Sequence, residues 1–147
     1  MEPTTTLIQC KRVFPHPAEH VYAAFLDPGQ VRQWFGPREF SIGTVEIDAV
    51  PGGQLAIEMI PPNGDRLWVK GAYTALVHGV VIAYTFAYEP DLPGLGSTLV
   101  TINFNRVENG TEVTLVHTIY KTINPTGRAK GWEAGLDKME TLLNTKD

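Results

Sequence analysis

A single apolar stripe runs through residues 125–147. Its members recur three and four residues apart, which is the spacing that places side chains on one face of an α-helix. They are Ala129, Trp132, Leu136, Met139 and Leu143. The spacing predicts a long amphipathic helix. Such a helix must bury its stripe, so we expect the preceding chain to supply the surface that it packs against.

Two glycines, Gly131 and Gly135, lie beside this stripe. Each costs a helix about 1 kcal/mol relative to alanine, so we expect a compensating reason for both. That reason is either close packing against a neighbouring element or open space above the helix. Arg128 precedes Trp132 by four residues and therefore projects near the apolar face. A charge there indicates an exposed first turn or a polar anchor at the mouth of a cavity.

The composition excludes several classes of protein. With 147 residues, 43% of them hydrophobic and 19% charged, the chain is typical of one soluble globular domain spanning residues 1–147. The net charge of −4, without any Lys/Arg run, gives no support for a nucleic-acid partner. We expect no membrane insertion and a cytoplasmic location, because no signal-peptide pattern or long apolar segment is present. Cys10 has no second cysteine to pair with and is expected to be a buried thiol.

The pattern before the C-terminal helix predicts mostly strands. Residues 5–14 form a first strand, and the period then changes to that of two short helices, residues 17–26 and 30–35, separated by Asp27-Pro28-Gly29. Six further strands are predicted over residues 40–50, 54–60, 66–77, 80–88, 98–107 and 111–120. Tight turns such as Asn63-Gly64 join most of them, which favours an antiparallel meander. The segment 89–96 is predicted to be a loop.

Alternation along these strands indicates which face is turned inward. We expect the face covered by the final helix to carry Tyr84, Phe86, Phe104, Leu115 and His117. The strand 66–77 is ambiguous, because Trp68 and Tyr73 fall on opposite faces and only one of them can point inward.

A series of short motifs runs in order along nearly the whole chain. They are Phe14-Pro15-His16-Pro17-Ala18-Glu19 with Val21, Asp27-Pro28, Trp34-Phe35-Gly36-Pro37, Asp48 with Pro51-Gly52-Gly53, Asn63-Gly64, Gly71 with Tyr73, Tyr84-Thr85-Phe86, Gly110-Thr111, and Gly131-Trp132 with Leu136 and Leu142. In this order they resemble the family named after the activator of the heat-shock-protein ATPase, within the START-like, or SRPBCC, superfamily. The resemblance implies an α+β helix-grip fold. This is a curved seven-stranded antiparallel sheet around a long C-terminal helix, with two short helices after the first strand.

The same resemblance implies a place for a ligand. Members of the superfamily hold apolar or amphipathic small molecules between the sheet and the final helix, and some catalyse cyclisation or hydrolysis there. The fold alone does not supply a substrate.

Two histidine patterns are candidate chemical sites. His16 and His20 spell the H-x-x-E-H motif of inverted zinc proteases, but Pro17 favours the first helical position, so we expect a solvated helix end and no metal. His117 lies among apolar residues on the inward face. It is either a core histidine whose hydrogen bonds are satisfied internally or a group that binds or activates a ligand. No nucleophile constellation is present, so we expect no catalytic residue and no cofactor.

We therefore expect a binding module for a small apolar or amphipathic molecule rather than an enzyme. The predicted ligand-binding residues are Ile57, Met59, Tyr73, Tyr84, Phe86, Phe104, His117, Arg128, Gly131, Trp132, Gly135 and Met139. Two alternatives stay open. One is a cyclase or hydrolase that uses His117 and a tyrosine, and the other is a co-chaperone-like module that contacts a chaperone, which we rank last. A homodimer also stays open.

Overall fold

The computed structural model describes residues 5–91, 94–123 and 125–145. The strands are β1 (Thr6–Phe14), β2 (Ser41–Ile47), β3 (Gln54–Ile60), β4 (Leu67–Val77), β5 (Val81–Glu89), β6 (Thr98–Val107) and β7 (Gly110–Ile119). The helices are α1 (Ala18–Leu26), α2 (Pro28–Trp34) and α3 (Thr126–Asn144). The predicted order of elements is confirmed, with boundaries that differ by a few residues.

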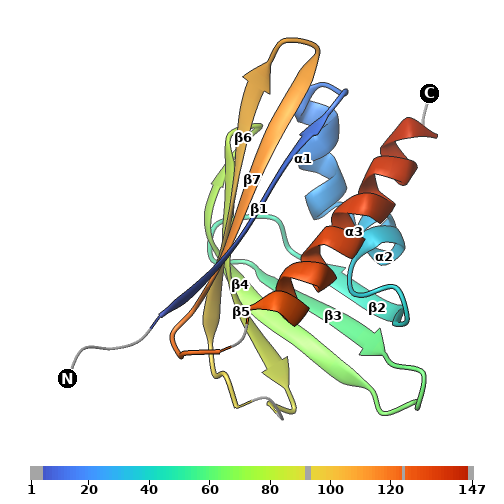
Figure 1. The fold of residues 1–147 in the computed structure, drawn as a ribbon, viewed down its shortest axis with the longest axis vertical. Coiled ribbons are helices and arrows are strands. Elements are labelled where there is room, and N and C mark those ends of the chain that lie inside the picture. The colour runs from blue at the N-terminus through green and yellow to red at the C-terminus, as the bar shows by residue number, and fades with distance from the viewer. Residues whose placement is uncertain (1–4, 92–93, 124, 146–147) are drawn as a thin grey trace.

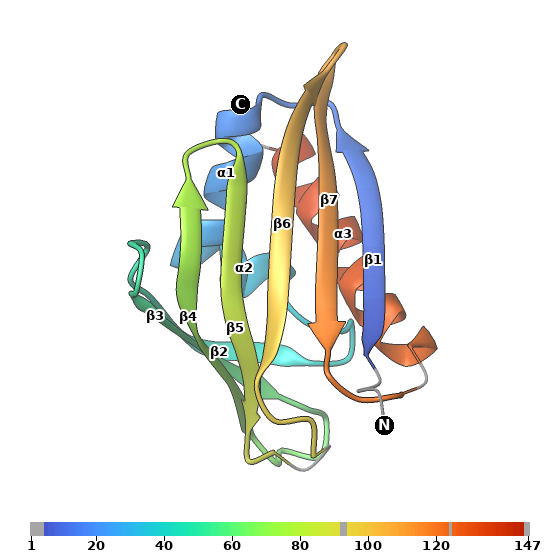
Figure 2. The same cartoon turned by 90° about the vertical axis from the view of Figure 1, so that its left-hand side faces the viewer.

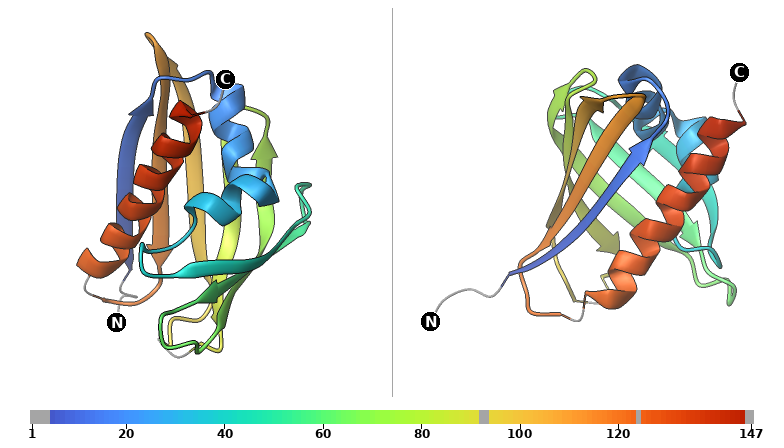
Figure 3. Two further views of the ribbon diagram at one scale, coloured as in Figure 1. Left: turned by 90° about the vertical axis from the view of Figure 1, so that its right-hand side faces the viewer. Right: turned by 45° about the horizontal axis from the view of Figure 1, so that its top comes forward.

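The strands form one antiparallel sheet in the order β1-β7-β6-β5-β4-β3-β2. Neighbours in sequence are neighbours in the sheet, except that β1 pairs with β7, from Thr6 opposite Ile119 to Phe14 opposite Thr111. Figure 1 shows the sheet curving around α3, and Figure 2 shows the strands in front with the three helices behind them. The views in Figure 3 place α1, α2 and α3 on the same face of the sheet. This is the predicted helix-grip arrangement.

The two short helices join at one residue. Asp27 is the C-cap of α1 and also the N-cap of α2, whose first residue is Pro28. The predicted second helix begins two residues later, because Asp27-Pro28-Gly29 also fits a break between helices. Proline is favoured at the first helical position, where its missing N–H would have no partner in the helix, so it begins α2 here.

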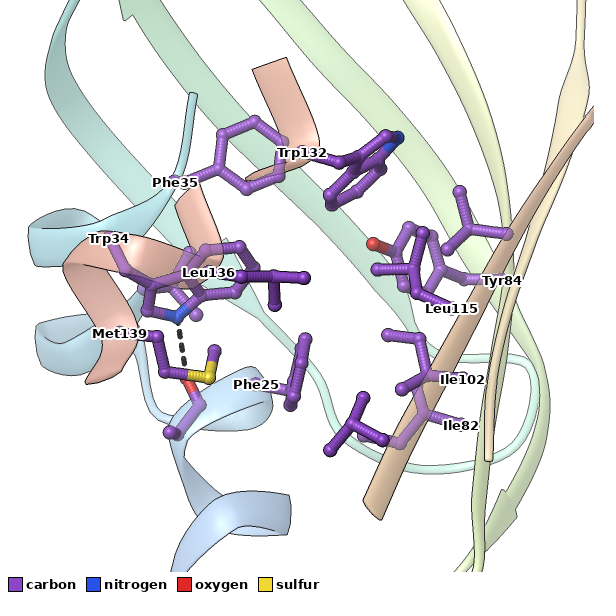
Figure 4. Packing of buried hydrophobic residues seen from close by; sticks show 14 of the residues in the cluster. Phe25, Trp34, Phe35, Ile82, Tyr84, Ile102, Leu115, Trp132, Leu136 and Met139 are labelled. Atoms are coloured by element: carbon purple, nitrogen blue, oxygen red, sulfur yellow. Dashed lines mark hydrogen bonds between the residues drawn. The ribbon is translucent and has the colours of Figure 1, made fainter. Parts of the chain in front are cut away.

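Trp34 is the residue through which α2 enters the core. Its indole nitrogen donates a 2.8 Å hydrogen bond to the backbone oxygen of Ala24 in α1. Its ring lies 5.2 Å from that of Phe25 and 5.5 Å from that of Phe35. Figure 4 shows these rings facing Leu136 and Met139 of α3, with Ile82, Ile102 and Leu115 of the sheet on the other side. The core therefore lies between the helices and the concave face of the sheet.

The pairing of β4 with β5 is irregular next to Tyr73, one of the two residues of β4 whose inward or outward direction the sequence leaves ambiguous. The register shifts between Tyr73 and Ala75, as at a β-bulge. Tyr73 points inward and is only 3% exposed, whereas Trp68 is half-buried and lies 5.6 Å beneath the ammonium group of Lys70. The inward residue is thus the tyrosine.

A charged cluster connects α3 to the edge strand β1. The guanidinium of Arg12 lies 2.7 Å from Asp137, 3.1 Å from Glu133 and 3.5 Å from Glu140, and its side chain is only 19% exposed. Arg38 contacts the other carboxylate oxygen of Asp137 at 3.3 Å. These contacts fix α3 against β1. In the described part of the chain, no helix is long and apolar enough to cross a membrane.

Candidate functional site

A cavity of about 420 Å³ lies between the first half of α3 and the sheet. Its walls come from β3, β5, β7, α3 and the segment that follows α2. The lining residues are Phe35, Gly36, Pro37, Met59, Phe86, Tyr88, His117, Gly127, Arg128, Gly131 and Trp132. Most of the inner wall is aromatic or aliphatic. The volume is within the range of roughly 300–1,000 Å³ that is common for small-molecule sites.

A larger depression on the molecule is a weaker candidate. It has a volume of about 1020 Å³ and lies over β2, β3 and β4, with Glu46, Asp48 and Lys70 among its lining residues. No aromatic side chain lines it. Ligand sites combine apolar and aromatic walls with a few polar groups, so the cavity beside α3 fits this description better.

His117 forms the floor of the cavity and has partners on both ring nitrogens. The indole nitrogen of Trp132 donates to Nδ1 at 3.2 Å, and Nε2 lies 2.8 Å from the hydroxyl oxygen of Thr98. That hydroxyl donates to the backbone oxygen of Phe86 at 2.7 Å. Because Trp132 can only donate, Nδ1 must be the acceptor. The imidazole is therefore neutral with its proton on Nε2, which donates to Thr98.

Burial keeps this imidazole neutral. Desolvation, followed by the positive charge of Arg128, lowers the pKa of His117 to about 4. The lone pair of Nδ1 is occupied by Trp132, so the ring has no free acceptor for a substrate proton. The arrangement matches a core histidine whose hydrogen bonds are satisfied internally, one of the two predicted alternatives. It gives little support to His117 as a general base.

Arg128 and Tyr88 form the polar side of the cavity. Nη1 of Arg128 donates a 3.2 Å hydrogen bond to the Tyr88 hydroxyl, and the guanidinium carbon lies 5.6 Å from the centre of the Tyr88 ring. Both side chains are half-buried. Burial raises the pKa of Tyr88, and the charge and hydrogen bond of Arg128 partly oppose that rise. The phenol is therefore neutral near pH 7 and keeps a proton to donate.

The two glycines of α3 are favoured at their positions for different structural reasons. A Cβ atom at Gly131 would approach only Pro37, at 3.8 Å, so the surface above Gly131 is open and forms part of the cavity wall. A Cβ atom at Gly135 would lie 3.1 Å from the backbone oxygen of Trp34 and 3.3 Å from its ring. The space expected above Gly135 is therefore filled by α2. Open space explains one glycine, and close packing explains the other.

The predicted ligand residues divide into two groups. Those that line the cavity are Met59, Phe86, His117, Arg128, Gly131 and Trp132. The others do not line it. Ile57, Tyr73 and Tyr84 surround a void of only about 10 Å³ next to Phe25 and Trp34. Phe104 packs edge-on against Tyr22 and Phe25, and Met139 is fully buried. They fill the core because the short helices cover this part of the sheet.

Sequence reasoning missed other lining residues, namely Phe35, Gly36, Pro37, Tyr88 and Gly127. Tyr88 shares the alternation of Tyr84 and Phe86, which could have identified it. Gly127 precedes Gly131 by four residues and so lies on the same helical face. The segment from Phe35 to Pro37 carries no comparable signal, because its place beside α3 depends on how α2 packs.

The zinc-protease pattern does not form a metal site. His16 lies before Pro17 and outside α1, and its Nε2 lies 2.8 Å from Oδ1 of Asn144. Across residues 5–91, 94–123 and 125–145, no three His, Cys, Asp or Glu side chains are grouped so that they could hold a metal ion.

Solved structures of other proteins resemble this chain over nearly its whole length. Protein CV1439 from Chromobacterium violaceum shares 31% identity, with a TM-score of 0.86 over 95% of this chain and 98% of that one. A protein from Staphylococcus epidermidis shares 24% identity, with a TM-score of 0.83 over 99% and 94% of the two chains. The AHSA1 protein from Silicibacter pomeroyi shares 20% identity, with a TM-score of 0.79 over 95% and 98%. The last two show the fold alone. No curated protein matches the chain.

The sequence also matches the model of one family over residues 15–144. That family is described as Activator of Hsp90 ATPase homolog 1-like protein, and the match covers the short helices, β2 to β7 and α3. The resemblance inferred from the short motifs is thereby confirmed. The chain belongs to the Activator of Hsp90 ATPase homolog 1-like family.

Proposed function

We propose that this chain is a binding protein for a small amphipathic molecule, which it encloses between α3 and the sheet. The observation that carries the proposal is the cavity of about 420 Å³, which has an aromatic inner wall and a single polar side formed by Arg128 and Tyr88. Burial of an apolar ligand there would be favourable by roughly 25 cal/mol for each Å² removed from water. We propose further that residues 1–147 form a single binding domain and that the protein is cytoplasmic.

Catalysis in this cavity has less support. An enzyme that used His117 as a base would need a free ring nitrogen, and both are hydrogen-bonded to protein groups. Tyr73 and Tyr84, the two tyrosines among the predicted ligand-binding residues, do not line the cavity. The geometry therefore supports binding better than acid–base chemistry.

A chaperone-related role has support only from the description of the family, which refers to an activator of the Hsp90 ATPase. No contact or surface of the described residues favours it. It stays the alternative that we rank last, and the test is whether the purified chain stimulates a chaperone ATPase.

The cavity can be tested by filling it. N-phenyl-1-naphthylamine is a neutral apolar dye that becomes fluorescent when it leaves water, and we expect the native protein to bind it. In Gly131→Leu the new side chain would enter the open space above Gly131, so we expect at least a tenfold loss of dye affinity.

The matched control is Lys130→Leu, which adds the same side chain at an exposed position of α3. It should bind the dye as the native protein does. Thermal melts would show that both variants fold. Undiminished dye binding by a folded Gly131→Leu variant would disprove the proposal. Native mass spectrometry of the purified protein would then search for a ligand that co-purifies with it.

A further inference from the structure

We propose that the natural ligand carries a carboxylate or a similar anionic head group, which Arg128 and Tyr88 bind at the polar side of the cavity. The apolar body of this ligand would lie against Phe86 and Trp132. The inference rests on the proposed binding function and adds the chemical class of the ligand. It is carried by four observations on these residues and their surroundings.

The first observation is that Arg128 has no anionic partner within the described residues. Arg12, Arg38, Arg66 and Arg106 each contact a carboxylate within 4 Å. Arg32 is exposed, so water can solvate its charge. Arg128 is half-buried and bonds to the neutral hydroxyl of Tyr88. A partly desolvated guanidinium without a counter-ion attracts an anion more strongly than a solvated one.

The second observation is that the first turn of α3 adds positive potential at Arg128, and that neither this turn nor the cavity lining contains a carboxylate. Arg128 is in the first turn of α3, where the helix dipole is positive, and this turn contains no acidic residue. No carboxylate is among the residues that line the cavity. The positive charge of Arg128 also acts at the floor of the cavity, because it adds to the effect of burial in lowering the pKa of His117.

The third observation is the donor geometry. The Tyr88 hydroxyl accepts from Nη1 of Arg128, which leaves the phenolic proton free for another acceptor. The guanidinium has further N–H groups in a planar fork, a shape suited to the two oxygens of a carboxylate. An anion at the rim could therefore accept from both residues.

The fourth observation is that the polar side-chain groups at the floor of the cavity are already hydrogen-bonded within the protein. Both nitrogens of His117, the indole N–H of Trp132 and the hydroxyl of Thr98 are engaged with one another or with the backbone of Phe86. A polar ligand group placed there would lose its bonds to water without replacement. The apolar part of the ligand belongs at this end, and the charged head belongs at Arg128.

The test compares two probes of nearly equal shape, 1-naphthylacetate and the neutral 1-naphthylacetamide. Their affinities would be measured by displacement of N-phenyl-1-naphthylamine. We expect the native protein to bind the carboxylate about tenfold or more tightly than the amide, because a charge-assisted hydrogen bond is stronger than a neutral one. Arg128→Gln should remove this difference by weakening the carboxylate about tenfold more than it weakens the amide. Arg32→Gln removes an equal charge outside the cavity and should change nothing.

The outcomes separate this inference from the proposed function. Dye that fails to bind, or that binds equally after Gly131→Leu, would overturn the binding proposal and the present inference together. Dye that binds in the cavity, with equal affinities for carboxylate and amide, would overturn only the anionic head group. Equal weakening of both probes by Arg128→Gln would also overturn it, because Arg128 would then shape the cavity rather than bind a charge. Tyr88→Phe should weaken the carboxylate several-fold more than the amide.

Discussion

The indole nitrogen of Trp132 on α3 donates to Nδ1 of His117 on β7 across a distance of 3.2 Å. This hydrogen bond joins the final helix to the sheet at the floor of the cavity. It also fixes the tautomer, since Nδ1 must remain without a proton to accept it. Protonation of His117 would break the bond, which connects the stability of the fold to pH.

We predict that stability falls as the pH is lowered from 7 to 5, because of His117. Its pKa is about 4 in the folded protein, below the ordinary value of 6.5. The unfolded chain therefore binds more protons in this window, and the free energy of unfolding should decrease by about 2 kcal/mol between pH 7 and pH 5. Urea denaturation at several pH values measures this slope. Well below pH 4, where the folded protein is protonated as well, His117 would contribute no further loss.

The contribution of His117 can be isolated by His117→Gln, which can still accept from Trp132 and donate to Thr98. Its free energy of unfolding should depend less on pH in the same window. His20→Gln, at an exposed position, should keep the native slope. The window ends at pH 5 because the lowered pKa values of Glu19, Glu58 and Asp91 add their own loss of stability at lower pH. An unchanged slope in His117→Gln would contradict the prediction.

The two glycines of α3 should respond in opposite directions to alanine. Gly131→Ala meets only an ordinary contact with Pro37, so we expect a gain of about 0.5–1 kcal/mol from helix propensity. Gly135→Ala gains the same propensity, but its Cβ atom lies 3.1 Å from the backbone oxygen of Trp34. We expect a net loss of about 1 kcal/mol or more from overpacking. Melting temperatures of the two variants compare them, and stabilisation of both would disprove the packing explanation for Gly135.

The cluster around Arg12 should stabilise the fold in a salt-dependent way. Arg12→Gln removes the cation shared by Glu133, Asp137 and Glu140, and these carboxylates would then repel one another along α3. We expect a loss of about 1 kcal/mol or more in dilute buffer, which shrinks as NaCl screens the repulsion. Urea unfolding at low and high NaCl concentration measures it. Arg106→Gln breaks an exposed pair with Glu19 and should cost much less.

Cys10 should be unreactive in the folded protein. It is buried in the core, and desolvation, reinforced by Glu133 and opposed by Arg12, raises its pKa to about 11. The thiolate is the reactive form, so Ellman's reagent at pH 8 should label native protein at least 100-fold more slowly than protein unfolded in urea. Rapid labelling of one thiol per chain under native conditions would contradict both the burial and the pKa.

Most of the fold could be predicted from local sequence signals. The strands β3 and β6 have the predicted boundaries, since alternation and turn residues mark both ends. The boundary of α2 was wrong, because Pro28 fits both a break and a first helical position. The stripe from Ala129 to Leu143 identified the helix that packs on the sheet. These signals depend on neighbours in sequence, which a single chain displays directly.

The cavity could be predicted only in part. Alternation placed Phe86 and His117 on the inward face, but it placed Tyr84 and Phe104 there as well. Whether an inward side chain fills the core or lines a cavity depends on what lies opposite. Opposite Tyr84 are Phe25 and Trp34 of the short helices, whereas Phe86 faces the opening beside Gly131.

Periodicity, turn residues and short motifs are local properties of the chain, and they were enough to predict the order of the elements, most of the inward faces and the family. Only the packing of the folded chain distinguishes the reasons for Gly131 and Gly135, since open space and close packing both favour glycine. It also decided the state of His117, because an imidazole in an apolar strand can be a base or a satisfied core residue. Only the positions of Trp132 and Thr98, brought to it from distant parts of the chain, distinguish the two.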